Sequence, residues 1–271
     1  LELLDRQKPV AGEYQYSVTT TWAMNFTAVE QESAAAADLL RFSAFLAPDD
    51  IPVEMIVEGA AELGSHLSDC LSSALSDPLA VDGVVQSLTR YSLVRKDVSR
   101  SSYSVHRMVQ EVVKHGMDEA TQRLWAERTV RALNTGFPHV EFQSWPRCDK
   151  LLPHAMAAAE LVSHFGLELD VTGRLLTETA DYLSARARYG EAEPLFQRAL
   201  KIREKVLGTE APDVAISMND LAFLYGQQGK YADAEALHQR ALQIREKALG
   251  PEHLDVATSL NNLALIYGEQ G

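Results

Sequence analysis

The sequence has only two cysteines, Cys70 and Cys148, so it cannot form a network of disulfides or a cysteine-based zinc site. It has no uncharged apolar run near the roughly 18–20 residues that a membrane-spanning helix needs. No charged segment followed by an apolar stretch and a cleavage site opens the chain, which argues against a signal peptide. We therefore expect a cytoplasmic protein that does not enter a membrane.

Motifs for catalysis and nucleotide binding are missing as well. The sequence has no GxxxxGKS or GxxxxGKT phosphate loop, no GxSxG nucleophile elbow and no HExxH zinc motif. The eight histidines are scattered, and the local sequence pairs none of them with a nucleophile. We expect no enzymatic activity, and no catalytic, metal or cofactor site, within this chain.

Positive charge is scarce, because 25 lysines and arginines stand against 38 aspartates and glutamates, a net charge of −13. A chain with this balance is a poor candidate for wrapping nucleic acid. The charges are unevenly distributed: residues 29–82 hold 11 acidic side chains and one basic one, whereas residues 90–107 hold five basic and one acidic. A cationic segment therefore follows an anionic one.

An internal repeat dominates the C-terminal part of the chain. Residues 189–207 and 231–249 are identical at 13 of 19 positions, at an offset of 42 residues. Each unit contains two helices by apolar periodicity, a first one over 213–228 in the second unit and a second one over 231–249. Gly229 suits the turn between them, because glycine tolerates a positive φ.

The repeat resembles the tetratricopeptide repeat, and its 42-residue length resembles the kinesin light chain type. The resemblance rests on Leu221-Ala222, Tyr225, Gly229, Tyr231, Ala234 and Ala241. The first unit departs from the pattern, with Asp181 in place of Phe223 and Ala187 in place of the turn glycine. The third unit stops at Gly271 without its second helix, so we expect a piece of a longer protein whose array continues.

Residues 1–117 have a different pattern, with 1–13 as a linker. Helices are expected over 33–45, near 52–56, over 67–75, after a cap at Asp82, and up to Gly116; strands are expected over 91–94 and 102–105. Helices with one β-hairpin are the winged-helix arrangement. The predicted fold is mainly α: a winged helix over 1–117, a helical spacer or cap over 118–167, and tetratricopeptide repeats over 168–271.

The order of several short segments resembles the C-terminal part of bacterial NB-ARC–tetratricopeptide proteins, which belong to the STAND class of nucleotide switches. The similar segments are 46–52, 88–94, 105–110, Trp145 and 152–154. The resemblance implies an upstream nucleotide-binding domain that holds ADP or ATP with Mg²⁺. It also implies that His106, the histidine of a Met-His-Asp motif, contacts a phosphate of ADP. Val105 replaces the Met, and Arg107 replaces the Asp with reversed charge.

His106 stands where a strand passes into a helix, and the first free backbone N–H groups of a helix favour an anion. The alternative is that it is only a polar residue at a helix start. Basic residues of the hairpin, Arg95, Lys96 and Arg100, suit phosphates or an acidic partner. We favour docking on an acidic neighbour over DNA, with residues 29–82 as the intramolecular partner.

The first helices of the repeats offer a peptide groove. Its predicted residues are Asn219, Phe223 and Gln227 in the second unit and Asn261, Asn262 and Leu265 in the third. Asparagine is a poor helix former, so its presence in mid-helix suggests that it holds a peptide backbone. Alternatively, these side chains are solvated or bond to the next helix.

The sequence thus favours the regulatory part of a nucleotide switch, in which the repeats bind a protein or peptide trigger and the winged helix holds an ADP-bound domain closed. One alternative is a constitutive protein–protein interaction scaffold. Another is a DNA-binding regulator that uses the hairpin.

Overall fold

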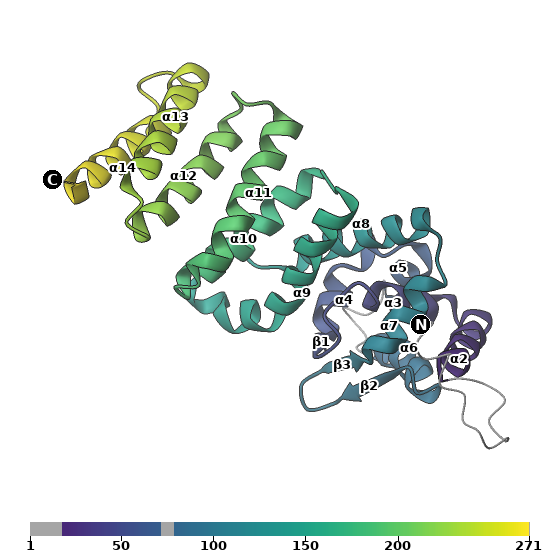
Figure 1. Cartoon of the computed structure of the whole chain (residues 1–271). Coiled ribbons are helices and arrows are strands. Elements are labelled where there is room, and N and C mark those ends of the chain that lie inside the picture. Colours follow the sequence, from purple (N-terminus) through teal and green to yellow (C-terminus); the bar gives the residue numbers. More distant parts are fainter. Residues whose placement is uncertain (1–17, 72–78, 271) are drawn as a thin grey trace, which may run out of the picture. The chain divides into compact units, whose positions relative to one another are not determined.

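Helices make up almost all the regular structure in the residues that the computed structural model describes, 18–71 and 79–270 (Figure 1). This confirms the predicted mainly-α class. The chain divides into two units. One comprises Leu1–Gly136 and Asp149–Gly166, and the other comprises Phe137–Cys148 and Leu167–Gly271.

The first unit is built around helix α3 (Ala34–Ser43), whose Leu39, Leu40 and Phe42 are fully buried. Ser33 caps its start by accepting a hydrogen bond from the Ala36 amide at 3.2 Å, as a serine at this position should. The other helices of the unit are α2 (Val18–Glu32), α4 (Val53–Glu58), α5 (Ser65–Leu71), α6 (Leu79–Arg90), α7 (Arg107–His115) and α8 (Glu119–Gly136). All of these except α4 pack against α3.

A small antiparallel sheet completes the first unit, in the order β1-β3-β2 (Figure 1). The predicted hairpin is confirmed as β2 (Val94–Asp97) and β3 (Ser102–Val105). Its first strand begins three residues later than expected, because Ser92 has a φ of 56° and turns the chain. β1 (Ile51–Pro52), which pairs with β3, was not predicted.

Two further expectations for this unit need correction or fall outside the described chain. Asp82 lies in the first turn of α6, which begins at Leu79, so it is not the cap of that helix. The helix expected over 67–75 is α5, which ends at Leu71; residues 72–75 lie outside the described residues. Helix α2 had no counterpart among the predicted elements.

The predicted spacer contains α8, a 3₁₀ turn η2 (Phe142–Ser144) and α9 (Trp145–Phe165). Its residues are shared between the two units, since 137–148 belong to the second. The domain boundaries at 117 and 167 stay a prediction.

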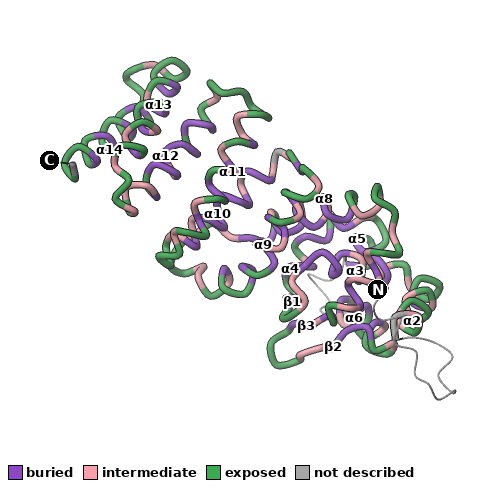
Figure 2. Tube along the Cα trace, viewed as in Figure 1, coloured by how far each residue is buried: buried purple, intermediate pink, exposed green. Residues whose placement is uncertain are grey.

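The second unit stacks helix pairs, α10 (Asp170–Ala185) with α11 (Tyr189–Leu207) and α12 (Pro212–Gln227) with α13 (Tyr231–Leu249), followed by α14 (Leu254–Gln270). Figure 2 shows a buried stripe along each paired helix. Small residues allow the close approach: Ala222 of α12 and Ala234 of α13 are fully buried and share a core cluster with the buried Ile266 of α14. The predicted solenoid is therefore confirmed.

The turns inside the two helix pairs share one backbone conformation. Gly229 has a φ of 75°, and Ala187, 42 residues earlier, has a φ of 58°. A residue with a Cβ is strained there, so the first repeat carries a cost that the second avoids. Among the described residues, no helix has the length and apolarity to cross a membrane.

Candidate functional site

His106 is the N-cap of α7, with extended backbone angles, as the strand-to-helix position predicted. Its Nδ1 accepts a hydrogen bond from the Met108 amide at 3.1 Å, and its ring lies 5.5 Å from that of Trp22, centroid to centroid. Because Nδ1 is an acceptor, the neutral ring carries its proton on Nε2. The side chain is exposed, so this N–H is available to an acceptor.

The backbone amides at the start of α7 are less free than the sequence suggested. The Met108 amide is bonded to the His106 ring, while those of Val109 and Gln110 bond to the His106 carbonyl at 2.8 and 3.2 Å. An anion here would therefore meet the imidazole rather than a nest of amides. His106 also lines an open cavity of about 640 Å³, which Arg95 and Lys96 line as well.

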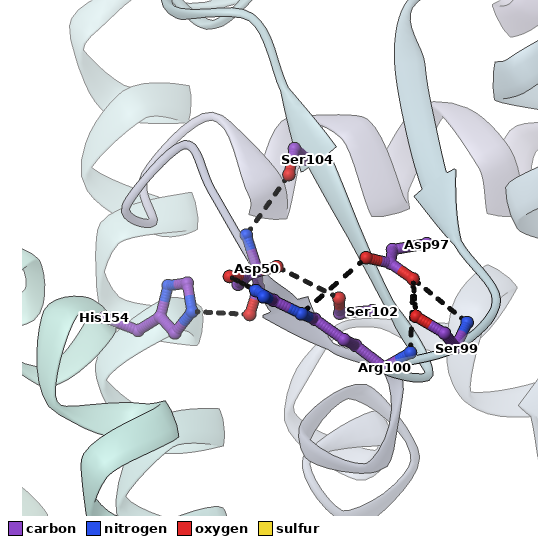
Figure 3. Close-up of polar contacts among 7 residues, drawn as sticks. All are labelled: Asp50, Asp97, Ser99, Arg100, Ser102, Ser104 and His154. Carbon is purple, nitrogen blue, oxygen red and sulfur yellow. Dashed lines mark hydrogen bonds and ion pairs between the residues drawn. The ribbon is translucent and has the colours of Figure 1, made fainter.

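The cationic hairpin is largely neutralised by the anionic segment that precedes it. Arg100 Nη1 lies 2.7 Å from Asp50 Oδ2, and Lys96 Nζ lies 2.6 Å from Asp82 Oδ1. Figure 3 shows Arg100 bridging Asp50 and Asp97. The expectation that residues 29–82 supply the intramolecular partner is confirmed. Arg95, in contrast, has no ion pair within the described residues.

Asp50 joins three parts of the first unit (Figure 3). Its amide donates to Ser104 Oγ at 3.2 Å, and its Oδ1 accepts from Ser102 Oγ at 3.3 Å, so it is fixed to β3. Its carbonyl oxygen lies 3.4 Å from Nε2 of His154 in α9. Burial lowers the pKa of His154 to about 4, so this ring is neutral near pH 7.

In the second unit, two cavities form what we call the repeat groove. One, of about 460 Å³, is lined by Val140 and residues of α10–α12, and the other, of about 430 Å³, by residues of α12–α14. Phe223 and Gln227 line both, while Asn262 and Leu265 line the second. Phe223 is 60 % exposed and Leu265 62 % exposed, as befits residues on a binding face.

Asn219 does not belong to this groove, which corrects the prediction. Its side chain is buried, and its amide lies 2.7 Å from His238 Nδ1 of the neighbouring helix α13. With the amide nitrogen turned toward His238, the amide oxygen accepts from Arg245 at 2.9 Å. It therefore bonds to the next helix, the alternative that the sequence left open. Asn261 is exposed but lines neither cavity.

Two carboxylates of the groove were not predicted as site residues. Asp181 and Asp220 line the first cavity, and neither forms a hydrogen bond or ion pair within the described part of the chain. Burial, with the charges of Asp220 and Glu178, raises the pKa of Asp181 to about 7. Burial also raises the pKa of Asp220 to about 6, although Arg203 and Arg245 act in the opposite direction. Their poor hydration marks this cavity as a place where a cation would be favourable.

A third acid, Glu178, holds a stretch of the chain itself. Its Oε1 lies 2.9 Å from His139 Nδ1, and its Oε2 accepts from the Val140 amide at 3.1 Å. Arg174 Nη2 adds a bond to the Phe137 carbonyl at 3.1 Å. The carboxylate of Glu178 raises the pKa of His139, first through the hydrogen bond and then through its charge. Among the described residues, no group of three His, Cys, Asp or Glu is arranged to bind a metal ion.

Comparison with known proteins finds one family that matches the repeats and another that matches part of the first unit. Residues 171–247 and 219–271 match the tetratricopeptide repeat family, which confirms the predicted repeats. Residues 27–122 match a family described as a domain of unknown function (DUF7779).

One curated relative is a nucleotide-binding leucine-rich repeat (NLR)-like protein of Hyaloscypha variabilis, 28 % identical over 227 residues. The match covers 81 % of this chain and 21 % of the relative, so the chain spans about a fifth of that protein's length. The crystal structure of BtubC (BKLC) from P. vanneervenii is similar with a TM-score of 0.46 and 19 % identity, over 81 % of this chain and 84 % of that one.

Proposed function

We propose that the chain is the regulatory part of a longer nucleotide switch of the STAND class. In this proposal the repeats bind a protein or peptide trigger, and the first unit acts as a winged helix on an NB-ARC-type domain that binds ADP or ATP with Mg²⁺. The similarity to an NLR-like protein supports a switch of this general kind. Such a switch works when the trigger and the nucleotide favour different states.

The observation that carries this proposal is the geometry of His106. The Met108 amide fixes the ring, so the Nε2–H group of the neutral form faces away from the helix start. Arg95 lies on the wall of the same open cavity and has no ion pair within the described residues. A neutral N–H donor and a free guanidinium fit a phosphate group that a neighbouring domain presents.

The test is ADP retention by the full-length protein. The His106→Leu variant removes the N–H donor and should purify with at least threefold less bound ADP, measured by chromatography of the extracted nucleotide. His115→Leu, at the other end of α7, is the matched control because His115 is also exposed, and it should retain the normal amount. Equal ADP in both variants, or none in the unmutated protein, would overturn the proposal.

A second candidate is a constitutive interaction scaffold, which the exposed Phe223 and Leu265 of the repeat groove favour. It predicts partner binding that Phe223→Ser abolishes and that His106→Leu and nucleotide leave unchanged. The buried Asn219 is unsuitable for this test, because its replacement disturbs the contact with His238.

DNA binding through the hairpin is disfavoured, because Lys96 and Arg100 already pair with aspartates. It would require salt-dependent duplex binding that Arg95→Ala and Lys96→Ala weaken.

A further inference from the structure

The first repeat already binds a stretch of polypeptide that has no regular secondary structure, residues 137–140. Glu178 of α10 receives His139 on one carboxylate oxygen and the Val140 amide on the other, at 2.9 and 3.1 Å. Glu178 raises the pKa of His139, so one carboxylate here favours the charged form of a side chain while it also holds the backbone of the next residue. Val140 then enters the lining of the first groove cavity.

The next repeat presents an equivalent carboxylate that has no such occupant. The 42-residue offset places Asp220 of α12 at the position of Glu178, and Asn262 of α14 at the following one. Within the described chain, Asp220 has no hydrogen bond or ion pair, and neither has Asp181 across the same cavity. The second repeat thus has a carboxylate at the position of Glu178, on a side chain one methylene shorter, and this carboxylate has no partner among the described residues.

Apolar surface follows directly after these carboxylates. Phe223 lies on the wall between the two cavities, and Leu265, its equivalent in the third repeat, lines the second with Ile266 and Tyr231. Asn262 and Gln227 offer amide groups beside this surface, suited to the backbone of an extended peptide. Both cavities therefore have apolar lining; Asp181 and Asp220 are the carboxylates of the first, and Glu269 is the carboxylate of the second.

We propose that the repeat groove binds an extended segment of a partner protein that carries a lysine or arginine followed by an apolar side chain. The cation lies between Asp181 and Asp220, and the apolar side chain lies against Phe223 and Leu265. This deepens the proposed function, and it rests on the repeats being the part that binds a protein or peptide. Packed helices lie about 8–10 Å apart and an extended chain advances about 3.3 Å per residue, so the two anchors are about three residues apart.

The same geometry makes binding depend on pH. Asp181 and Asp220 take up protons near neutral pH because burial disfavours both charges; the charge of Asp220 adds to this effect at Asp181, and the charge of Glu178 adds to it at both. A bound cation favours the charged forms, so binding should weaken as the pH falls from 8 to 5.5. The charges of Glu178, His139 and Arg203 also shift the pKa of Asp181, and those of Arg203, Arg245 and Glu178 shift the pKa of Asp220. The pH dependence of peptide binding must therefore be compared between the unmutated chain and variants of the two aspartates.

The experiment selects peptides from a random nonapeptide phage library on the intact chain at pH 8. Selected peptides should be enriched in lysine or arginine with a large apolar residue about three positions away. Fluorescence anisotropy of synthetic copies then gives affinities for the unmutated chain and for Asp181→Asn/Asp220→Asn. This double variant should bind at least tenfold more weakly and lose the pH dependence.

The double variant also separates binding from folding. Replacing two repelling carboxylates by amides should raise the thermal midpoint of the chain at pH 8 while the affinity falls. A purely structural role would move both in the same direction. The matched control is Asp213→Asn/Asp255→Asn, which removes two exposed charges from the first turns of α12 and α14 and should keep the affinity.

The outcomes distinguish failure of this proposal from failure of the proposed function on which it rests, the binding of a protein or peptide by the repeats. If the selected peptides lack basic residues, or bind the Asp181→Asn/Asp220→Asn chain as tightly, but lose binding with Phe223→Ser, the groove binds peptides and the proposed ligand class is wrong. If no peptide depends on Phe223 or on the aspartates, the groove is not the binding surface, and both proposals fail at this site.

Discussion

His154 donates from Nε2 to the backbone carbonyl oxygen of Asp50, 3.4 Å away, while the Asp50 carboxylate pairs with Arg100 of the hairpin (Figure 3). The ring is fully buried, and its Nδ1 has no partner within the described residues. Asp50 itself has a φ of 52°, which an aspartate tolerates better than most residues. One histidine of α9 thus fixes the turn that joins α3 to the sheet.

The burial of His154 predicts a loss of stability in mild acid. His154 has a pKa of about 4 in the folded chain, below its ordinary value of 6.5, so the unfolded chain binds the proton first. The stabilisation is complete above pH 6.5 and falls as the pH drops toward 4, by about 2 kcal/mol between pH 7 and pH 5. His154→Gln keeps the donor to Asp50 without titrating, so its urea stability should lose about 2 kcal/mol less over the same interval.

The measurement needs a reporter in the first unit. Trp125 is buried there, and replacing Trp22 and Trp145 by phenylalanine leaves it as the one tryptophan of the chain. The exposed His115 provides the control, since His115→Gln should leave the pH dependence unchanged. An identical loss in the unmutated chain and in His154→Gln would show that His154 protonates freely in the folded state.

Gln110 predicts a second effect in the same unit. Its buried amide donates to the carbonyl oxygens of Ser43 and Leu46, at 2.8 and 3.0 Å, and so satisfies the end of α3. Gln110→Leu removes both bonds inside the core and should lower the free energy of unfolding by about 1–3 kcal/mol. Gln86→Leu, at an exposed position of α6, should change it by less than about 0.5 kcal/mol. Urea titration of both variants, with Trp125 as reporter, checks the difference; equal values would contradict the role of Gln110.

The repeats were predictable because the same residue pattern recurs at an offset of 42 residues and each helix has a regular apolar stripe. Helix α13 begins and ends as expected, at Tyr231 and Leu249. β1 has only two residues, and its partner β3 lies about 50 residues away, so no local pattern indicates it. The fold was therefore accessible where local periodicity determines it, and less so where distant pairing does.

The groove shows where sequence reasoning reaches its limit. One residue along a helix is a rotation of about 100°, so a small error in the orientation of a helix exchanges a groove residue for an interior one. Asn219 was placed in the groove, but the structure buries it and gives the cavity to Asp220. In the third repeat the same rotation favours Asn262 over Asn261. The 42-residue offset already made Asp220 equivalent to Glu178. The contacts of Glu178 with His139 and Val140 are needed to show that this position can hold a polypeptide segment.

Ala187 predicts a stabilising substitution. It occupies the turn position of Gly229 with a φ of 58°, a conformation that costs a residue with a Cβ about 1 kcal/mol or more. Ala187→Gly should therefore raise the free energy of unfolding by about 0.5–1 kcal/mol, after the greater entropy of glycine in the unfolded chain is subtracted. Ala232→Gly, at an exposed position in helix α13, should lower it by about 1 kcal/mol. If urea titrations gave a lower free energy of unfolding for Ala187→Gly than for the unmutated chain, the turn would not be strained.

Asp181 predicts a substitution whose benefit depends on pH. In the folded chain its pKa is about 7, above its ordinary value of 3.8, so the folded state holds a proton that the unfolded state has released between these values. Stability from this group therefore falls as the pH rises through that interval, and the full cost of the charge is present above pH 7. Asp181→Asn removes the charge and should stabilise the second unit by about 1–2 kcal/mol at pH 8, a magnitude reduced because the cavity admits solvent.

At pH 5 the gain from Asp181→Asn should be smaller, because the folded carboxyl is already neutral. Urea titration reports it through Trp145 as the sole tryptophan, whose ring lies 6.3 Å from that of Tyr182 on the same helix as Asp181. Asp213→Asn should instead lower the free energy of unfolding by a few tenths of a kcal/mol at pH 8, since that exposed carboxylate stabilises the N-terminus of α12 through the helix dipole. A gain for Asp181→Asn that is equal at both pH values would mean that Asp181 is well hydrated, and the cation site between it and Asp220 would lose its physical basis.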